Sequence, residues 1–216
     1  MVFFARALQG NSFFLGRLLL ATIILMVPCI ISGQPQVFSD TKSYYVLGQA
    51  VGEKLGIAPV QSEAVSLRGK GGGAAAEARE VRLAYTVSAS RSPYYSLYLY
   101  SGSRIGSAWL LVALQSLLTS ALIWIVVDLF EVWLFYELTV ALLAFTTSAA
   151  IFIFFIMPDF ASPLGILAFA LLVLKWNMLS WARIALLSVT LLIACVFHTS
   201  NLLLVCTLMA MTAVYS

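Results

Sequence analysis

The chain has 216 residues, of which 62% are hydrophobic and 10% are charged, and its formal net charge is +3. A soluble domain carries about 25% charged residues, so this composition excludes an ordinary soluble protein and indicates a polytopic membrane protein. The small positive charge and the lack of a basic stripe argue against a nucleic-acid partner. We therefore expect an all-α transmembrane helical bundle whose first partner is the lipid bilayer.

The first long apolar run covers residues 13–32, with Arg17 near its start. This run is long enough for one membrane span, which needs about 20 residues. It also resembles the apolar core of a signal peptide, but Ile31 and Gly33 fit poorly at a small-residue cleavage site. We therefore expect residues 1–32 to form a cytoplasmic N-terminus and an uncleaved first transmembrane helix.

Residues 33–106 hold most of the polar sequence and are predicted to form a long external loop with interfacial helices. A first helix is expected to begin near Ser39 or Asp40, because either side chain is a suitable N-cap. The glycine run of RGKGGGAAAEAREVR lacks the spacing of a phosphate-binding loop and is interpreted as a flexible connection. The apolar face of the first helix is predicted to comprise Tyr44, Leu47, Val51 and Leu55.

The segment RSPYYSLYLYSGSR is predicted to form a second helix in this loop, with Ser92 as N-cap and Pro93 in the first turn. Its tyrosines, at positions 94, 95, 98 and 100, make a dense aromatic patch. One interpretation is an aromatic belt at the membrane interface. The other is a groove for a phosphate and a sugar or lipid chain, bordered by Arg91, Tyr94 and Tyr95, with the guanidinium as phosphate ligand.

Residues 107–216 contain five further apolar runs and are predicted to supply transmembrane helices 2–6, giving about six spans in all. The fourth run of the chain is short, so it must lean on neighbours, extend through Lys175 and Trp176, or stop short of spanning. The last run ends at AVYS without a polar flank, so we expect a chain truncated at its C-terminus. The predicted runs cover residues 107–127, 138–157, 161–174, 182–197 and 200–215.

Lysines and arginines in short loops set the expected orientation. Arg6 and Arg17 precede the first span, and Lys175 and Arg183 flank the connector between the fourth and fifth runs. If every run spans, these residues lie on one side of the membrane, which is then the cytoplasmic side. The expected location is a bacterial inner membrane, with the N-terminus in the cytoplasm and the long loop outside.

Three polar residues beside apolar runs form a candidate site at the external face. Asp40 follows the first run, Asp159 follows the third, and His198 ends the fifth. Ionisable residues at such places are costly and often mark chemistry. One carboxylate is expected to act as base toward an acceptor hydroxyl while the other positions it or helps bind a divalent metal, and His198 and Arg91 are expected to stabilise a departing phosphate. The structural alternatives are an N-cap for Asp40, a helix-dipole contact for Asp159 and an interfacial helix break at His198.

The three cysteines, Cys29, Cys195 and Cys206, all lie inside apolar runs. A CxxC pair is absent, and one histidine cannot complete a zinc cage of histidines and cysteines. We interpret the cysteines as small buried apolar residues.

The arrangement resembles the multi-spanning C-type glycosyltransferases, which include protein mannosyltransferases, aminoarabinose transferases of lipid A and related bacterial sugar transferases. Asp40 in SDTKSYY matches the family's acid after the first helix, and Asp159 in MPDF matches its later acid at an external helix end. HTSN and RSPYY look like stretches found in bacterial membrane proteins of this general type. The residues expected to bind substrate are Arg91, Tyr94, Tyr95, His198 and Asn201.

The resemblance implies inverting transfer of a hexose or pentose from a polyprenyl-phosphate donor. The acceptor is then a glycan, a lipid or a protein at the outer face. The resemblance also implies a divalent metal ion, Mg²⁺ or Mn²⁺, for which Asp40 and Asp159 are the candidate ligands.

Two other functions stay open from the sequence. A fragment of a transporter or permease predicts internal repeats or helices broken by Gly or Pro at the midplane, and Pro163 and Gly165 give slight support. A non-catalytic membrane scaffold predicts that Asp40 and Asp159 tolerate substitution. The long external loop favours the transferase, because permeases usually keep their loops short.

Overall fold

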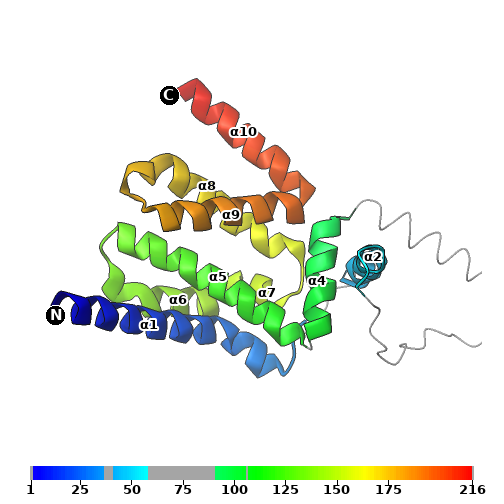
Figure 1. Ribbon diagram of the computed structural model, residues 1–216, viewed down its shortest axis with the longest axis horizontal. Helices are drawn as coiled ribbons and strands as arrows, with labels where there is room; N and C mark the ends of the chain where they lie inside the picture. Colours follow the sequence, from blue (N-terminus) through cyan, green and yellow to red (C-terminus); the bar gives the residue numbers. More distant parts are fainter. Residues whose placement is uncertain (1, 37–40, 58–90, 106, 216) are drawn as a thin grey trace, which may run out of the picture.

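The computed structural model describes residues 2–36, 41–57, 91–105 and 107–215, and within these ranges the protein is helical with no strand. Long helices run back and forth as a bundle, and two short helices lie across one end of it (Figure 1). The all-α prediction is confirmed. The helices are α1 (Val2–Ser32), α2 (Thr41–Lys54), α4 (Pro93–Ile105), α5 (Ala108–Leu129), α6 (Tyr136–Thr146), α7 (Ala149–Phe154), α8 (Ala161–Lys175), α9 (Trp181–Phe197) and α10 (Thr199–Tyr215), with 3₁₀ turns η1 (Trp133–Phe135), η2 (Pro158–Phe160) and η3 (Trp176–Met178).

Among the described residues, three helices are long and apolar enough to cross a membrane, namely Phe13–Ser32, Ala108–Leu129 and Pro158–Met178. The first two match predicted apolar runs. The third contains the run that the sequence left too short, because the turns η2 and η3 lengthen α8 at both ends to 21 residues. The helix extends through Lys175 and Trp176, which was one of the three alternatives that the sequence left open for this short run. The helices α6, α9 and α10 are apolar but shorter.

The predicted run 138–157 is not one helix, and this prediction was wrong. The helix α6 ends before Thr147, whose backbone is extended at φ −125° and ψ 169°, and α7 begins at Ala149. The Thr147 hydroxyl donates to the carbonyl of Leu143 at 2.6 Å and accepts from the backbone N–H of Ala149 at 3.1 Å. Such side-chain bonds compete with the helical ladder, which explains the break inside an apolar run.

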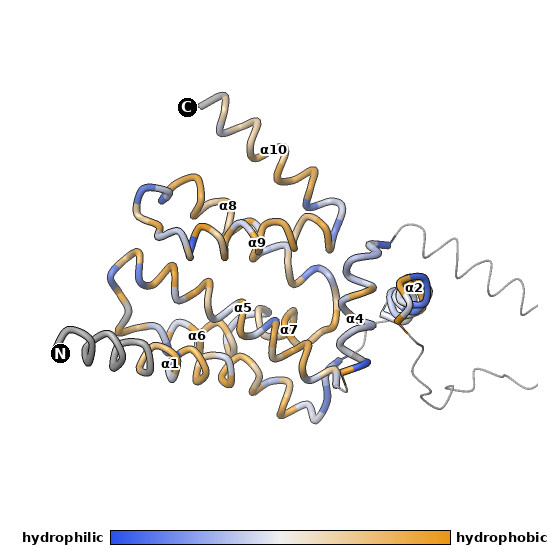
Figure 2. The backbone as a smooth tube through the Cα atoms, in the orientation of Figure 1, coloured by the Kyte–Doolittle hydropathy of each residue, from blue (hydrophilic) through white to orange (hydrophobic). Residues whose placement is uncertain are grey.

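Hydrophobic residues run along most of the helices of the bundle (Figure 2), and many large apolar side chains are exposed as well as buried, as expected where lipid is the solvent. Exposed examples come from several helices, such as Leu19, Leu142, Leu192 and Leu203. Several polar side chains are buried at helix contacts, where a hydroxyl donates to the carbonyl one turn earlier. This group includes Thr22, Thr119 and Thr190.

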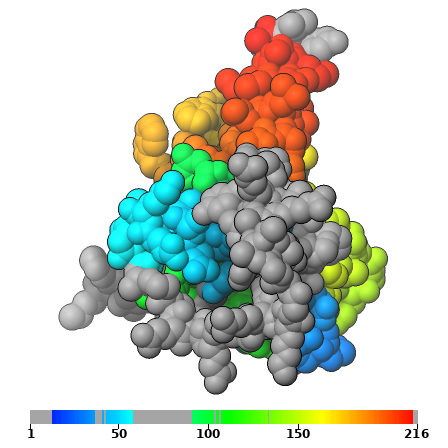
Figure 3. Space-filling model, turned by 90° about the vertical axis from the view of Figure 1, so that its right-hand side faces the viewer, coloured from blue at the N-terminus to red at the C-terminus, as the bar shows by residue number. Residues whose placement is uncertain are grey.

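The predicted amphipathic helix of the loop is α2, and it packs across α4 at one end of the bundle (Figure 1). Figure 3, viewed from this end, shows α2 in cyan on the surface and α10 extending away in red. A Cβ atom on Gly48 would lie 2.2 Å from the carbonyl oxygen of Ser96, and one on Gly52 would lie 2.6 Å from Cε1 of Tyr100. Two glycines one turn apart therefore let α2 lie directly on α4.

Candidate functional site

Asp159 lies in the 3₁₀ turn η2, between the extended residue Met157 and the start of α8. Pro158 occupies the first position of this turn, where its fixed φ is suited to the start of a helix and its missing N–H costs nothing. The Asp159 side chain is 39% exposed. The sequence therefore places a solvent-accessible carboxylate at the beginning of a long apolar helix.

His198 lies at the junction of α9 and α10, opposite this carboxylate. Its Nε2 atom is 3.5 Å from Oδ1 of Asp159, and its side chain is 34% exposed. On the other side of the ring, Nδ1 lies 2.6 Å from the hydroxyl oxygen of Ser200. Asp159 and His198, which the sequence indicated separately, are thus neighbours, and Ser200 contacts the other side of the histidine ring. We call Asp159, His198 and Ser200, with the nearby Tyr95, the Asp159 cluster.

The helix α4 is held against the end of α9, next to His198. The Ser92 side chain accepts a hydrogen bond from the Tyr95 backbone N–H at 3.3 Å, which confirms Ser92 as the N-cap. The Ser92 hydroxyl also donates to the carbonyl oxygen of Val196 in α9. The Tyr95 ring packs edge-on against Phe197, with 5.2 Å between ring centroids. One serine therefore both starts α4 and attaches it to the helix that carries the histidine.

The tyrosines of α4 divide into two groups. Tyr95 and Tyr100 are buried, so an aromatic belt facing the membrane interface does not describe them, whereas Tyr94 is 61% exposed. Burial raises the pKa of Tyr95 well above its usual range, and Tyr98, Tyr44 and Asp159 contribute in the same direction. The Tyr95 hydroxyl has no hydrogen-bond partner among the described residues. It is therefore a protonated donor close to Asp159.

Arg91 lies against α2. Its guanidinium carbon is 5.2 Å from the centroid of the Tyr44 ring in that helix, and the Tyr44 ring packs edge-on against Tyr95 at 5.1 Å. Arg91 and Tyr95 are thus linked through Tyr44, a residue that the sequence assigned only to the apolar face of α2. Tyr94, the other tyrosine proposed to border a groove, is on the exposed side of α4 and outside this group.

Asn201 is buried at the α9–α10 junction. Its side-chain N–H₂ donates to the carbonyl oxygen of Ala194 at 2.9 Å, and its backbone N–H donates to the carbonyl oxygen of His198 at 2.9 Å. The same carbonyl accepts from the backbone N–H of His198 at 3.3 Å, so the Asn201 amide is its second donor at the end of α9. This arrangement fixes the backbone of His198, so Asn201 positions the histidine.

Asp40, the first acid of the predicted site, lies outside the described residues. The residue that follows it, Thr41, is the first residue of α2, and its hydroxyl donates to the carbonyl oxygen of Ile156 at 3.1 Å. Ile156 also donates its N–H to Gln36 at 3.1 Å, just after the end of α1. The chain on both sides of Asp40 is therefore attached to the segment that leads into Asp159.

The described residues offer an incomplete metal site. Within the ranges that the structure covers, no group of three or more His, Cys, Asp and Glu side chains could hold a metal ion. Asp159 and His198 are two donors, whereas Mg²⁺ and Mn²⁺ favour six ligands dominated by oxygen. The described side chains therefore do not by themselves fit Mg²⁺ or Mn²⁺.

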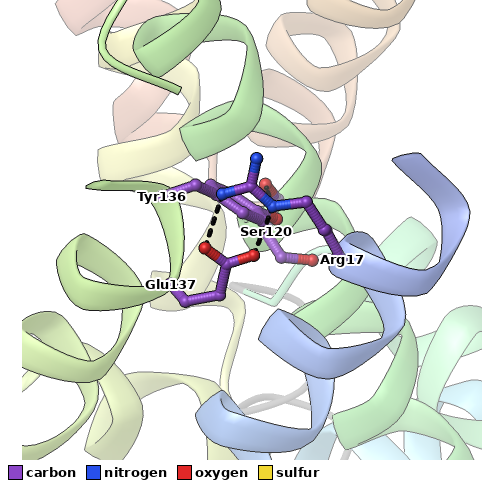
Figure 4. Close-up of polar contacts among 4 residues, drawn as sticks. All are labelled: Arg17, Ser120, Tyr136 and Glu137. Atoms are coloured by element: carbon purple, nitrogen blue, oxygen red, sulfur yellow. Dashed lines mark hydrogen bonds and ion pairs between the residues drawn. The ribbon is translucent and has the colours of Figure 1, made fainter. Parts of the chain in front are cut away.

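A second ionic group lies between α1, α5 and α6, and the sequence analysis did not identify it. The Arg17 guanidinium forms a two-pronged ion pair with Glu137, and its Nη2–H donates to Oε2 at 2.5 Å (Figure 4). Arg17 also lies over the rings of Phe13, Trp124 and Tyr136, at 5.3 to 5.7 Å from their centroids. The signal in the sequence was a lone arginine inside the first apolar run, because a charge in such a place is costly unless it is paired.

Hydrogen bonds beside this ion pair join α6 and α1 to the middle of α5. The Tyr136 hydroxyl donates to the carbonyl oxygen of Ser120 at 2.9 Å, and the Ser120 hydroxyl lies 3.0 Å from that of Thr22 (Figure 4 shows Tyr136 and Ser120). We call Arg17, Glu137, Tyr136 and Ser120 the Arg17 cluster. It connects three helices through paired polar groups, so it is arranged to hold the bundle together.

A cleft of about 420 Å³ lies beside the Arg17 cluster, with Trp124 in its wall. Asp128 and Arg183 also line it and form an ion pair, with Nη2 and Oδ2 2.5 Å apart. Because both charges are already paired, the cleft offers little net charge to a ligand. Comparison with protein-family models, with curated proteins and with solved structures finds no match for this chain.

Proposed function

We propose that the protein is an integral membrane glycosyltransferase of the inner membrane of a bacterium. It transfers a sugar from a polyprenyl-phosphate donor to an acceptor at the external face. The observation that carries the proposal is the contact between Asp159 and His198, a carboxylate and an imidazole 3.5 Å apart and each about one-third exposed. A carboxylate that accepts a proton and a neighbouring imidazole that donates a hydrogen bond are what acceptor deprotonation and phosphate departure require.

The proposed topology has about six spans and a cytoplasmic N-terminus. In support of it, the ends of α1, α7 and α9 meet at the Asp159 end of the bundle, through the bonds of Gln36 and Ser92. The ends of α5 and α9 that carry Asp128 and Arg183 meet at the other end. Lys175 lies there too, 5.2 Å from the Phe130 ring. Basic residues are favoured on the cytoplasmic side, which makes the Asp159 end external.

In the proposed reaction, Asp159 accepts the proton of the acceptor hydroxyl as that oxygen attacks the sugar carbon. The bond from that carbon to the donor phosphate breaks, and His198 and Arg91 stabilise the phosphate that leaves. Tyr95 is fully buried, so it supports this site from behind and does not contact the substrate. Asp40 acts with Asp159 as the second acid of the site.

The test measures sugar transfer from a polyprenyl-phosphate donor in membranes that carry the full chain. We expect Asp159→Asn and Asp40→Asn each to lower turnover by about 100-fold or more, since a positioned general base contributes about 10²- to 10⁴-fold. Asp128→Asn is the matched control, because it removes an acid at the other end of the bundle. The proposal fails if the Asp159 and Asp40 variants transfer sugar from donor to acceptor at the wild-type turnover.

A transporter is the second candidate, because two observations favour it. The helical run 136–154 is broken at Thr147, and discontinuous helices often form substrate sites in transporters. The Arg17–Glu137 ion pair inside the bundle is the kind of group found along transport pathways. Under this alternative, Glu137→Gln abolishes solute uptake into proteoliposomes and Asp159→Asn does not.

A further inference from the structure

Ser200 lies next to a base that is itself next to a carboxylate. The Ser200 hydroxyl oxygen is 2.6 Å from Nδ1 of His198, and Nε2 of the same ring is 3.5 Å from Oδ1 of Asp159. A nucleophile, a base within hydrogen-bond reach and a third group that orients the base are the three parts of covalent catalysis by serine. The sugar transfer proposed above does not use Ser200.

The carboxylate selects the tautomer that this chemistry needs. A neutral imidazole carries one N–H, and a carboxylate beside Nε2 stabilises the form with the proton on that atom. Nδ1 is then an acceptor, and the Ser200 hydroxyl donates to it. The contact between His198 and Asp159 is longer than a good hydrogen bond, and such contacts often shorten when substrate binds.

The position of Ser200 suits an attack on a carbonyl group. Ser200 is exposed and lies in the first turn of α10, a helix of 17 residues. The first N–H groups of a helix have no carbonyl partner within it, and their dipoles favour negative charge. The N–H of Asn201 already donates to the carbonyl oxygen of His198, so the other N–H groups of this first turn are the donors beside the serine, where an oxyanion would form. Asn201, in the same turn of α10, keeps the His198 backbone in place through its bonds to the carbonyl oxygens of Ala194 and His198.

We infer that Ser200 is a nucleophile toward acyl esters, with His198 as its base and Asp159 as the group that orients the histidine. The Ser200 oxygen bonds to the ester carbonyl carbon, and its proton passes to Nδ1 of His198. The bond from that carbon to the leaving alcohol breaks, and His198 returns the proton to the alcohol oxygen. Water then attacks the carbonyl carbon of the acyl-serine and gives a proton to His198. The bond from that carbon to the Ser200 oxygen breaks, His198 returns the proton to Ser200, and a carboxylic acid is released.

The substrate class follows from the surroundings of the serine. Leu203 and Leu204 lie three and four positions after Ser200, on the same face of α10, and are 73% and 38% exposed, so the surface next to the nucleophile is apolar. An ester borne on a lipid places its acyl chain on such a surface and its carbonyl group at the polar end of the helix. The inferred substrate is therefore an acyl ester of a membrane lipid.

The experiment treats the full chain, purified in detergent, with a fluorophosphonate probe. The Ser200 oxygen bonds to phosphorus, fluoride leaves, and the serine proton passes to His198, so the probe reports the nucleophile without a natural substrate. We expect one probe per chain, located on Ser200 by peptide mass spectrometry. Ser200→Ala abolishes labelling, and His198→Gln slows it about 100-fold or more, as loss of a general base does. Asp159→Asn slows it by less.

Ser180→Ala is the matched control, because Ser180 is an exposed serine at the start of α9 with no histidine partner in the described structure. Labelling of this variant equals that of wild type. The inference is overturned if wild type is labelled no faster than Ser200→Ala, or if His198→Gln labels at the wild-type rate. Labelling at Ser200 in a chain that transfers no sugar supports this inference and refutes the proposed function. Sugar transfer by a chain that the probe does not label at Ser200 supports the proposed function and overturns this inference.

Discussion

The Arg17–Glu137 ion pair and the Asp159–His198 contact differ in how completely the protein encloses them. In the Arg17 cluster, the side chains of Arg17 and Glu137 are 9% and 28% exposed, two nitrogens face two oxygens, and three aromatic rings surround the guanidinium. In the Asp159 cluster, one contact of 3.5 Å joins side chains that are 39% and 34% exposed. A charge away from water must be fully paired, whereas a charge beside water keeps capacity for a ligand. The first pair therefore stabilises the fold and the second is available for chemistry.

The largest expected effect is the loss of one partner of the Arg17–Glu137 pair. We expect Glu137→Leu to lower the free energy of unfolding by about 3–5 kcal/mol, because it leaves a buried arginine without its carboxylate. The measurement is equilibrium unfolding by SDS in mixed micelles. The double variant Arg17→Met/Glu137→Leu is the control and recovers most of the loss. A loss below about 1 kcal/mol for Glu137→Leu would show that this pair resembles the exposed one.

The next effect concerns the close crossing that holds the Asp159 end in shape. Gly48→Ala puts a methyl group 2.2 Å from the Ser96 carbonyl oxygen, so α2 must move away from α4, at a cost of about 1–3 kcal/mol. Gly16→Ala is the control, since a Cβ there meets nothing within 4 Å and alanine favours the helix. Unfolding of both variants in mixed micelles decides the point. Equal stability of the two variants would contradict the crossing.

A smaller effect is expected at the pair between Asp128 and Arg183, which is intermediate in exposure at 36% and 31%. Asp128→Asn should lower the free energy of unfolding by about 0.2–1 kcal/mol, the usual range for exposed pairs. Repeating the titration with added salt should reduce the difference from wild type, because exposed pairs are screened. A salt-independent loss of several kcal/mol would place this pair with the enclosed one.

The smallest effect on stability is expected in the Asp159 cluster. Asp159→Asn and His198→Gln should each change the free energy of unfolding by less than about 0.5 kcal/mol, because the contact is single and exposed. The same SDS titration measures it. If either variant lost as much as Glu137→Leu, the contact would be structural, and the distinction between the two ion pairs would not hold.

Local sequence determined the parts of the fold that depend on neighbouring residues. The apolar runs at 13–32 and 107–127 correspond to the candidate spans Phe13–Ser32 and Ala108–Leu129, although α1 itself begins earlier, at Val2. Length and hydropathy alone decide whether a helix can cross a membrane. Ser92 was recognised as a cap because capping involves residues within one turn. Asp159 and His198 were both identified as costly polar residues beside apolar runs.

Several features depended on contacts that no local signal reveals. The break at Thr147 lies inside an apolar run, where hydropathy predicted a continuous helix. The role of Gly48 and Gly52 as packing positions depends on the crossing of α2 with α4, which the local sequence does not reveal. The sequence analysis did not identify Ser200 as a functional residue. Its role depends on the fold, which places the His198 ring between Ser200 and Asp159.

Composition and periodicity by themselves determined that this protein is a helical bundle with apolar surfaces and a few exceptional polar residues. Which of those residues meet was decided by the tertiary structure alone. Arg17 and Glu137 are 120 positions apart, and their contact requires α1 and α6 to pack side by side. Hydropathy records how much it costs to bury a charge, but only the packing of helices supplies the partner that offsets the cost.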